Sequence, residues 1–215
     1  MSASNANGPP LLFIGAGAHA RSLLDALDAS ANIKGLLSQD GAQWGSRILG
    51  ATVLGGDDEL YLMKPTQVSL VNAVGSVSST AARRAVFERW RAAQFRFHGL
   101  IHKTAYVSET ALLGEGTQVL AQAYVGPGAA LGDNVLVNTR ALLEHGVQVG
   151  PHAHVAPGAV LLGEVRIGAG THVGAGATVL QGVHVGERCV IGAGAVVLHS
   201  LLDGQRVAGV PARSL

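Results

Sequence analysis

A period of six residues runs through the second half of the chain and restricts the folds it can adopt. From Val107 onward, every sixth residue up to Val197 is Val, Leu or Ile, sixteen positions in succession. Four residues after each of the first fifteen stands a small or β-branched residue, such as Ala123 or Thr171. Two inward registers at this period are typical of the hexapeptide β-helix, in which each repeat forms one short strand and one corner.

The repeat predicts a three-sided prism of stacked coils. Three hexapeptides close one coil of about 18 residues, so residues 107–196 provide five coils. Gly often follows the aliphatic position directly, as at Gly114 and Gly150, and we expect these glycines to let the backbone turn without strain. Cys189 stands in the small inward register, which predicts an inert core residue rather than a nucleophile.

The first hundred residues favour a separate α/β domain. Apolar segments predict strands at residues 11–14, 33–37, 52–54, 68–73 and 95–100. Amphipathic segments predict helices at residues 22–27 and 80–93, and Arg83 is expected on a solvent-exposed face of the second helix. Such alternation indicates a small parallel sheet. The glycine turn after the first strand stands where these sheets bind phosphates. It lacks the third glycine of a dinucleotide site, so another nucleotide diphosphate, or a turn that serves packing alone, remains open.

Composition limits the partners that the chain can have. The net charge of +1 gives no electrostatic footprint for nucleic acid. No run of 18 apolar residues is free of polar or Gly interruption, so we expect no insertion into a membrane. A single cysteine excludes an intramolecular disulfide and fits a reducing compartment. Residues 1–10 are predicted to be a disordered leader rather than a signal peptide, which makes a cytoplasmic location the default expectation.

Several motifs together resemble a known family. They are Gly15–His19, Asn72–Gly75, His102, the uninterrupted repeat, and the ending VAGVPAR at residues 207–213. This arrangement looks like the bacterial sugar acyltransferases of the sialic-acid O-acetyltransferase type, whose best-understood relatives N-acetylate UDP-4-amino-4,6-dideoxy sugars with acetyl-CoA. The resemblance implies a Rossmann-like nucleotide-sugar-binding domain at residues 11–101 and a left-handed parallel β-helix at residues 102–215.

The resemblance also implies roles for individual residues. His145 matches the general base of the family. The resemblance also implies that Glu144 and Asn138 belong to the same catalytic site. The nucleotide-sugar pocket is assigned to Gly17, Ala18, His19, Ser38 and Gly75, and the acetyl-CoA site to His154, Gly163, Ala175 and Ala193. Acetyl-CoA is the implied co-substrate, without a metal. Family members form homotrimers, which would place His145 in a cleft between neighbouring protomers.

Two positions depart from the family pattern. Many relatives have an acidic residue directly after the catalytic histidine, where this chain has Gly146. Many also have two aspartates after the second strand, where Ser38 and Gln39 stand. The first departure leaves the partner of His145 open, and the second leaves the nucleotide open.

The positions of the histidines in the repeat predict which way they face. His145 and His154 avoid both inward registers, so both side chains can point outward. His172 follows His154 by 18 residues and should stack one coil above it. We expect His152 to be solvated. No His, Cys or carboxylate spacing matches a metal-ligand pattern.

The chemistry of acyl transfer suits a histidine. An amino or hydroxyl acceptor must lose a proton as it attacks a thioester, and imidazole is a fitting general base for direct transfer without an acyl-enzyme. Three functions therefore stand beside one another: N-acetylation of a nucleotide-linked amino sugar, O-acetylation of a sugar such as a sialic acid, and a non-catalytic β-helix that binds or spaces partners.

Overall fold

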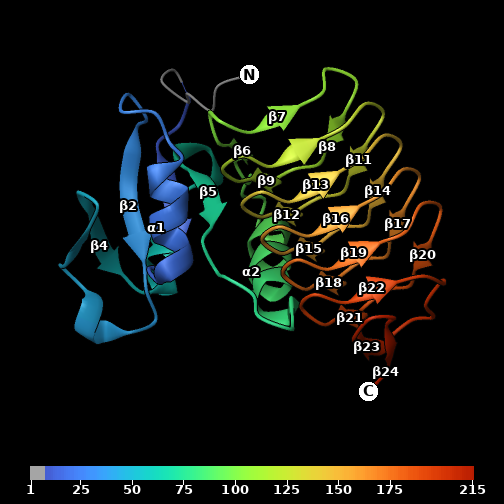
Figure 1. Ribbon diagram of the computed structural model, residues 1–215. Coiled ribbons are helices and arrows are strands. Elements are labelled where there is room, and N and C mark those ends of the chain that lie inside the picture. The colour runs from blue at the N-terminus through green and yellow to red at the C-terminus, as the bar shows by residue number, and fades with distance from the viewer. Residues whose placement is uncertain (1–7) are drawn as a thin grey trace.

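An α/β layer and a three-sided parallel β-helix lie side by side in the computed structural model (Figure 1), which describes residues 8–215. Residues 1–7, most of the expected leader, lie outside the described residues. Within residues 8–215, every helix is too short or too polar to cross a membrane.

The α/β layer contains five strands, two α-helices and three 3-10 helices. In chain order they are β1 (Leu11–Ile14), α1 (Ala18–Asp25), β2 (Ile33–Leu37), η1 (Gly41–Gln43), β3 (Arg47–Ile48), β4 (Ala51–Gly55), η2 (Asp57–Leu62), η3 (Pro65–Gln67), β5 (Ser69–Asn72) and α2 (Ala81–Ala92). The sheet order is β3-β4-β2-β1-β5. All pairs in it are parallel except β3 with β4.

This strand order creates one topological switch point. The chain runs from β1 outward through β2 to β4, and β5 then returns to the other side of β1. The four residues of β1 are at most 2% exposed, as expected of a central parallel strand covered on both faces. Helix α1 begins at Ala18, earlier than predicted, because it follows directly on the glycine turn with Gly17 as its N-cap. Of the expected strand at residues 95–100, there remain a bridge between Leu70 and Phe97 and the first residue of β6 (Leu100–Ile101), a strand of the prism.

The prism has three parallel sheets, which we call sheets I, II and III. Sheet I contains β6 (Leu100–Ile101), β9 (Gln118–Val119), β12 (Leu136–Val137), β15 (His154–Val155), β18 (His172–Val173), β21 (Val190–Ile191), β23 (Arg206–Ala208) and the antiparallel β24 (Arg213–Ser214). Sheet II contains β7 (Tyr106–Val107), β10 (Tyr124–Val125), β13 (Leu142–Leu143), β16 (Val160–Leu161), β19 (Thr178–Val179) and β22 (Val196–Val197). Sheet III contains β8 (Leu112–Leu113), β11 (Ala130–Leu131), β14 (Gln148–Val149), β17 (Arg166–Ile167) and β20 (His184–Val185).

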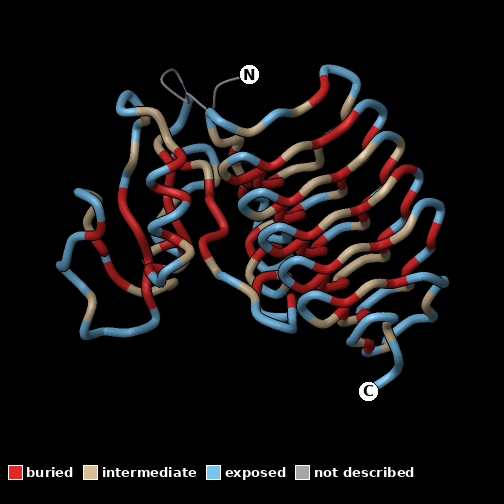
Figure 2. Tube along the Cα trace, viewed as in Figure 1, coloured by how far each residue is buried: buried red, intermediate tan, exposed pale blue. Residues whose placement is uncertain are grey.

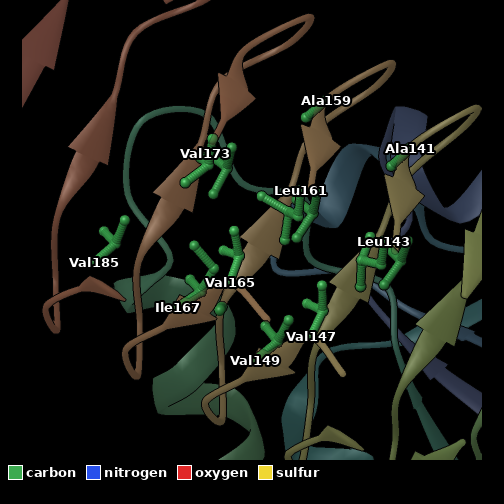
Figure 3. Packing of buried hydrophobic residues seen from close by; sticks show 14 of the residues in the cluster. Ala141, Leu143, Val147, Val149, Ala159, Leu161, Val165, Ile167, Val173 and Val185 are labelled. Carbon is green, nitrogen blue, oxygen red and sulfur yellow. The ribbon is translucent and has the colours of Figure 1, made fainter. Parts of the chain in front are cut away.

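Both predicted inward registers form the core of the prism. Leu143 and Leu161 stack in neighbouring coils of sheet II and are fully buried, and Ala141 and Ala159 lie beside them (Figure 3). Cys189 is 1% exposed in the small register, and its thiol donates to the carbonyl oxygen of Leu202 at 3.0 Å. The prediction that Cys189 is a core residue is therefore confirmed.

The glycines after the aliphatic register serve a purpose other than the predicted one. A Cβ added at Gly114 would lie 2.5 Å from the backbone nitrogen of Asp133, and one at Gly150 would lie 2.7 Å from that of Ala169. These glycines are needed because the next coil approaches closely. The left-handed backbone falls two residues later, at every sixth position from Gly116 to Gly194. Six of those corner positions carry a side chain, namely Gln122, Asn134, Arg140, His152, Glu164 and Arg188.

Sheet I is the face on which the α/β layer docks. Its outward residues Gln118, Leu136 and His154 are 0%, 1% and 4% exposed, and Figure 2 shows buried segments on both sides of this junction. Helix α2 lies between the five-stranded sheet of the layer and the prism (Figure 1), with Phe87 edge-on to His152. Docking thus buries polar side chains at the junction of the two parts.

Two predictions of solvent exposure are wrong for this reason. His152 is 9% exposed and lies 3.0 Å from Nδ2 of Asn134 through its Nδ1. Arg83 is 1% exposed, and its Nη1 donates to the carbonyl oxygens of Asn72 and Val74 at 2.8 and 3.2 Å. Because α2 packs against both the five-stranded sheet and the prism, it lacks the solvent-exposed face that the sequence pattern indicated.

Candidate functional site

A cleft of about 530 Å³ opens at the carboxyl ends of β1, β2 and β5. It lies at the switch point, where ligands of open α/β sheets bind. Gly15 and Gly17 line it after β1, Ser38 after β2, and Gly75 after β5. Gly15 has φ +110°, and a Cβ there would lie 3.0 Å from the backbone of Ala73. The two chain turns therefore meet closely at the floor of the cleft.

Three of the five residues predicted for this pocket line the cleft, and two do not. Gly17, Ser38 and Gly75 are lining residues, whereas Ala18 and His19 are not. Nε2 of His19 lies 3.0 Å from Oε1 of Gln118 on the outer face of sheet I. His19 thus connects the first turn of α1 to the prism.

Charged residues that the sequence did not single out stand in the cleft wall. Asp40, Asp57 and Arg89 line it, and Arg89 lies 3.8 Å from the carboxylate of Asp57. Asp57 follows β4 and Arg89 belongs to α2, so only the folded chain brings them together. Sequence spacing carried no signal for this pair.

A second cluster lies at the junction of the two parts, around His154. Nδ1 of His154 is 2.6 Å from the hydroxyl of Ser76, and its Nε2 is 3.2 Å from Nδ2 of Asn138. The ring of His172 stands edge-on at 4.9 Å between centroids, as the 18-residue spacing predicted. Ser76 directly follows the cleft residue Gly75, so this cluster adjoins the cleft.

Burial keeps these junction histidines neutral. Desolvation is the largest cause that lowers the pKa of His154 to about 3, and electrostatic interactions with His172, Arg83 and His19 lower it further. A hydrogen bond with Ser76 acts in the opposite direction and raises the pKa. Desolvation and then Arg83 lower the pKa of His19 to about 4. Desolvation also lowers the pKa of Arg83 to about 9. The imidazoles of His154 and His19 are therefore neutral beside the buried Arg83, and they act at the junction as hydrogen-bonding groups.

His145 lies elsewhere, at the edge of the prism between β13 and β14. Its side chain is 56% exposed, and its Nδ1 is 3.8 Å from Oε1 of Glu164. The backbone nitrogen of His145 donates to Oε2 of Glu144 at 3.3 Å. Among the residues that the structure describes, none forms a hydrogen bond with Nε2 of His145, which leaves this nitrogen accessible to a ligand.

Gly163 lies beside the ring of His145. It occupies the same edge one coil further on, and a Cβ there would lie 2.6 Å from Cε1 and from Nε2 of His145. Gly146 has a similar relation to Glu164, because an added Cβ would overlap the carboxylate. Register arithmetic could have identified Glu164, since it stands 18 residues after Gly146.

The prism separates these residues into two groups. His145, Glu144 and Gly163 lie on the edge between sheets II and III, while His154 lies on sheet I, the opposite face of the same prism. Ala175 and Ala193 are exposed on the edge between sheets I and II. A single chain therefore does not bring His145 and His154 together. Within residues 8–215, no three His, Cys, Asp or Glu side chains gather in a group that could hold a metal ion.

Comparisons with known proteins agree with this architecture. The bacterial transferase hexapeptide family (six repeats) matches residues 164–199. No curated protein sequence matches the chain. The acetyltransferase domain of PglB from Neisseria gonorrhoeae, solved in complex with acetyl coenzyme A, is 35% identical with a TM-score of 0.88, over 97% of this chain and 100% of that domain.

A second solved structure carries a sugar nucleotide. PerB from Caulobacter crescentus, in complex with CoA and GDP-perosamine, is 30% identical with a TM-score of 0.87, over 96% of this chain and 97% of that one. Two further structures of this perosamine N-acetyltransferase carry a substitution of a single histidine.

Proposed function

The chain belongs to the hexapeptide-repeat sugar acyltransferases, and on that basis we propose that it transfers the acetyl group of acetyl-CoA to the amino group of a nucleotide-linked sugar. The observation that carries this proposal is the imidazole of His145, exposed at a prism edge beside Gly163 with its Nε2 unoccupied by the described residues. The same relatives favour a left-handed coil and a Rossmann-like layer.

His145 acts as the general base in direct transfer. The amine lone pair attacks the thioester carbonyl carbon while Nε2 of His145 accepts the amine proton. Collapse of the tetrahedral adduct breaks the carbon–sulfur bond, and the imidazolium returns the proton to the departing CoA thiolate. The products are an N-acetylated sugar nucleotide and free CoA. Cys189 takes no part as a nucleophile, because it is buried and desolvation raises the pKa of its thiol.

The nucleotide part of the acceptor binds in the cleft at the switch point. Gly17 at the start of α1 presents backbone N–H groups to a diphosphate, and Gly75 allows the phosphates to approach the second turn. Because Ser76 follows Gly75 and contacts His154, the sugar end of the ligand is directed toward His154 and Asn138. Ser38 lies next to the ribose and base. His19 stabilises the first turn of α1 through its contact with Gln118.

Acetyl-CoA and the acceptor meet between protomers of a homotrimer. The cleft belongs to the α/β layer, which docks on sheet I, whereas His145 lies on the opposite edge of the prism between sheets II and III. A complete site therefore requires a second copy of the chain. We assign the acetyl-CoA path to the space between the edge with His145 and Gly163 in one protomer and the edge with Ala175 and Ala193 in its neighbour. The small side chains of both alanines let the ligand reach the backbone.

An acceptor panel tests the proposed reaction. CoA thiol release is measured with acetyl-CoA and UDP-, GDP- or dTDP-linked 4-amino sugars, and in parallel with free sialic acid. We expect release with at least one amino-sugar nucleotide and none with sialic acid. Release with sialic acid alone would establish O-acetylation instead, and failure to bind CoA in calorimetry would establish a non-catalytic prism.

A further inference from the structure

We infer that Glu164 is the positioning residue of His145, and that it supplies from the following coil the carboxylate that Gly146 cannot supply. This inference rests on the proposed role of His145 as the base. It concerns how the imidazole is oriented before the acceptor arrives. Two features of the edge support it, namely the distances around the ring and the space left by two glycines.

The distances distinguish Glu164 from the neighbouring Glu144. Oε1 of Glu164 is 3.8 Å from Nδ1 of the His145 ring. Glu144 directs its Oε2 toward the backbone nitrogen of His145 instead, at 3.3 Å. Among the described residues, Glu164 is the carboxylate that reaches the ring within ion-pair distance. Glu144 therefore holds the turn, and Glu164 faces the imidazole.

Two missing side chains make room for this pair. A Cβ at Gly163 would lie 2.6 Å from Nε2 of His145, and a Cβ at Gly146 would overlap the Glu164 carboxylate. Gly146 and Glu164 occupy the same left-handed corner position in successive coils, with φ +67° and +61°. A side chain at either glycine would separate the imidazole from the carboxylate.

Folding stability gives little reason for a glutamate at this corner. A residue with a Cβ is disfavoured at φ +61° relative to glycine. The side chains of His145 and Glu164 are 56% and 60% exposed, and surface ion pairs of this kind add little to folding stability. Five other corners carry a side chain in the same conformation, so the backbone alone does not mark Glu164, and its role rests on its distance to the imidazole and on the space left by the two glycines.

That role follows from the two nitrogens of the ring. A carboxylate facing Nδ1 favours the tautomer with hydrogen on Nδ1, which leaves the lone pair on Nε2 to accept the amine proton. The same carboxylate stabilises the imidazolium that forms. A distance of 3.8 Å is long for a hydrogen bond, and catalytic hydrogen bonds of this kind often tighten only when substrate is bound.

The charge-removing variant Glu164→Gln gives the first test. We expect kcat to fall roughly 10- to 100-fold, less than the ~10⁴-fold loss in a buried triad, because water also solvates this pair. The KM for acetyl-CoA and the melting temperature should stay at their wild-type values. In a His145→Ala background the same change should have no further effect on kcat. A wild-type kcat in Glu164→Gln, or an equal additional loss in the His145→Ala background, would overturn the inference.

Relocating the carboxylate gives the second test. Glu164→Gly should lower kcat without loss of stability, and Gly146→Asp added to it should restore part of kcat, because Asp tolerates the left-handed region and the clash is gone. Arg188→Gly, the same exchange at a corner on another edge, is the matched control and should keep wild-type kcat. A wild-type kcat in Glu164→Gly would contradict the inference.

A spectroscopic readout separates this inference from the proposed function. If no sugar nucleotide is acetylated, the proposed function fails, but the tautomer of His145 can still be observed by ¹⁵N NMR of the imidazole. We expect the Nδ1–H form in the wild type and a shift toward the Nε2–H form in Glu164→Gln. An identical tautomer in both proteins would overturn the role of Glu164.

Discussion

The imidazole of His145 lies against Gly163, where an added Cβ would be 2.6 Å from both Cε1 and Nε2. The backbone of Gly163 is outside the left-handed region, so alanine fits the chain itself. Gly163→Ala should therefore displace the ring rather than the coil. We expect kcat to fall by up to about 10²-fold, as small misplacements of a catalytic group do, with the melting temperature nearly unchanged.

Gly41→Ala provides the control for this change. Its added Cβ meets no atom within 4 Å and its φ is ordinary, so kcat should equal that of the wild type. Thiol release at saturating acetyl-CoA and acceptor measures both variants. Wild-type kcat in Gly163→Ala would mean that the ring position seen beside Gly163 does not matter for turnover.

Mixed assemblies test whether two protomers of the proposed homotrimer share one site. The side chain of Gly17→Trp should fill the cleft, because a Cβ at Gly17 meets no neighbouring atom, while His145→Ala removes the proposed base. Each variant alone should be nearly inactive. Refolding them together at equal concentration should restore about a quarter of wild-type activity, since random assembly pairs one intact cleft with one intact His145 at that frequency.

The outcome of mixing is decisive for the shared site. Analytical ultracentrifugation first establishes that each variant assembles like the wild type. If the two variants assemble together and the mixture stays inactive, the cleft and His145 of the same chain must cooperate, contrary to their separation across the prism.

The junction histidines make stability depend on pH. The pKa values of His154 and His19 fall from 6.5 to about 3 and about 4 in the folded chain, so the unfolded chain binds more protons below pH 6.5. Their contribution is complete above pH 6.5 and is lost as pH falls through this range. By linkage, each should cost about 2 kcal/mol of unfolding free energy between pH 8 and pH 5.

His154→Gln isolates one of these contributions. Denaturant unfolding at pH 8 and pH 5, at one protein concentration, gives the free-energy difference for each protein. The variant should lose less stability between the two pH values, by about 2 kcal/mol, than the wild type. An identical pH dependence would show that His154 is not held neutral by burial.

The prism was largely predictable because its repeat is local. Every coil repeats the same inward registers, so Leu143, Leu161 and Cys189 could be placed in the core from spacing alone. The same arithmetic stacked His172 on His154. The cleft was partly predictable as well, because a glycine turn after a first strand marks the switch point of such sheets.

Contacts between the two parts were not predictable in this way. Arg83 and His152 look solvent-exposed in their own segments and are buried only because α2 docks on sheet I. Glu164 is a different case, because it lies within the prism and its position one coil after Gly146 could have been read from the 18-residue spacing. The sequence pattern describes each element against solvent, and tertiary packing decides which polar groups face each other.

The most direct test of the account is the turnover of His145→Ala. CoA release is measured at saturating acetyl-CoA and amino-sugar nucleotide, and acetyl-CoA binding is measured separately by calorimetry. Loss of the proposed general base predicts a kcat lower by roughly 10²- to 10⁴-fold, with acetyl-CoA affinity preserved. Wild-type turnover in this variant would contradict the central claim that the imidazole at the prism edge removes the acceptor's proton.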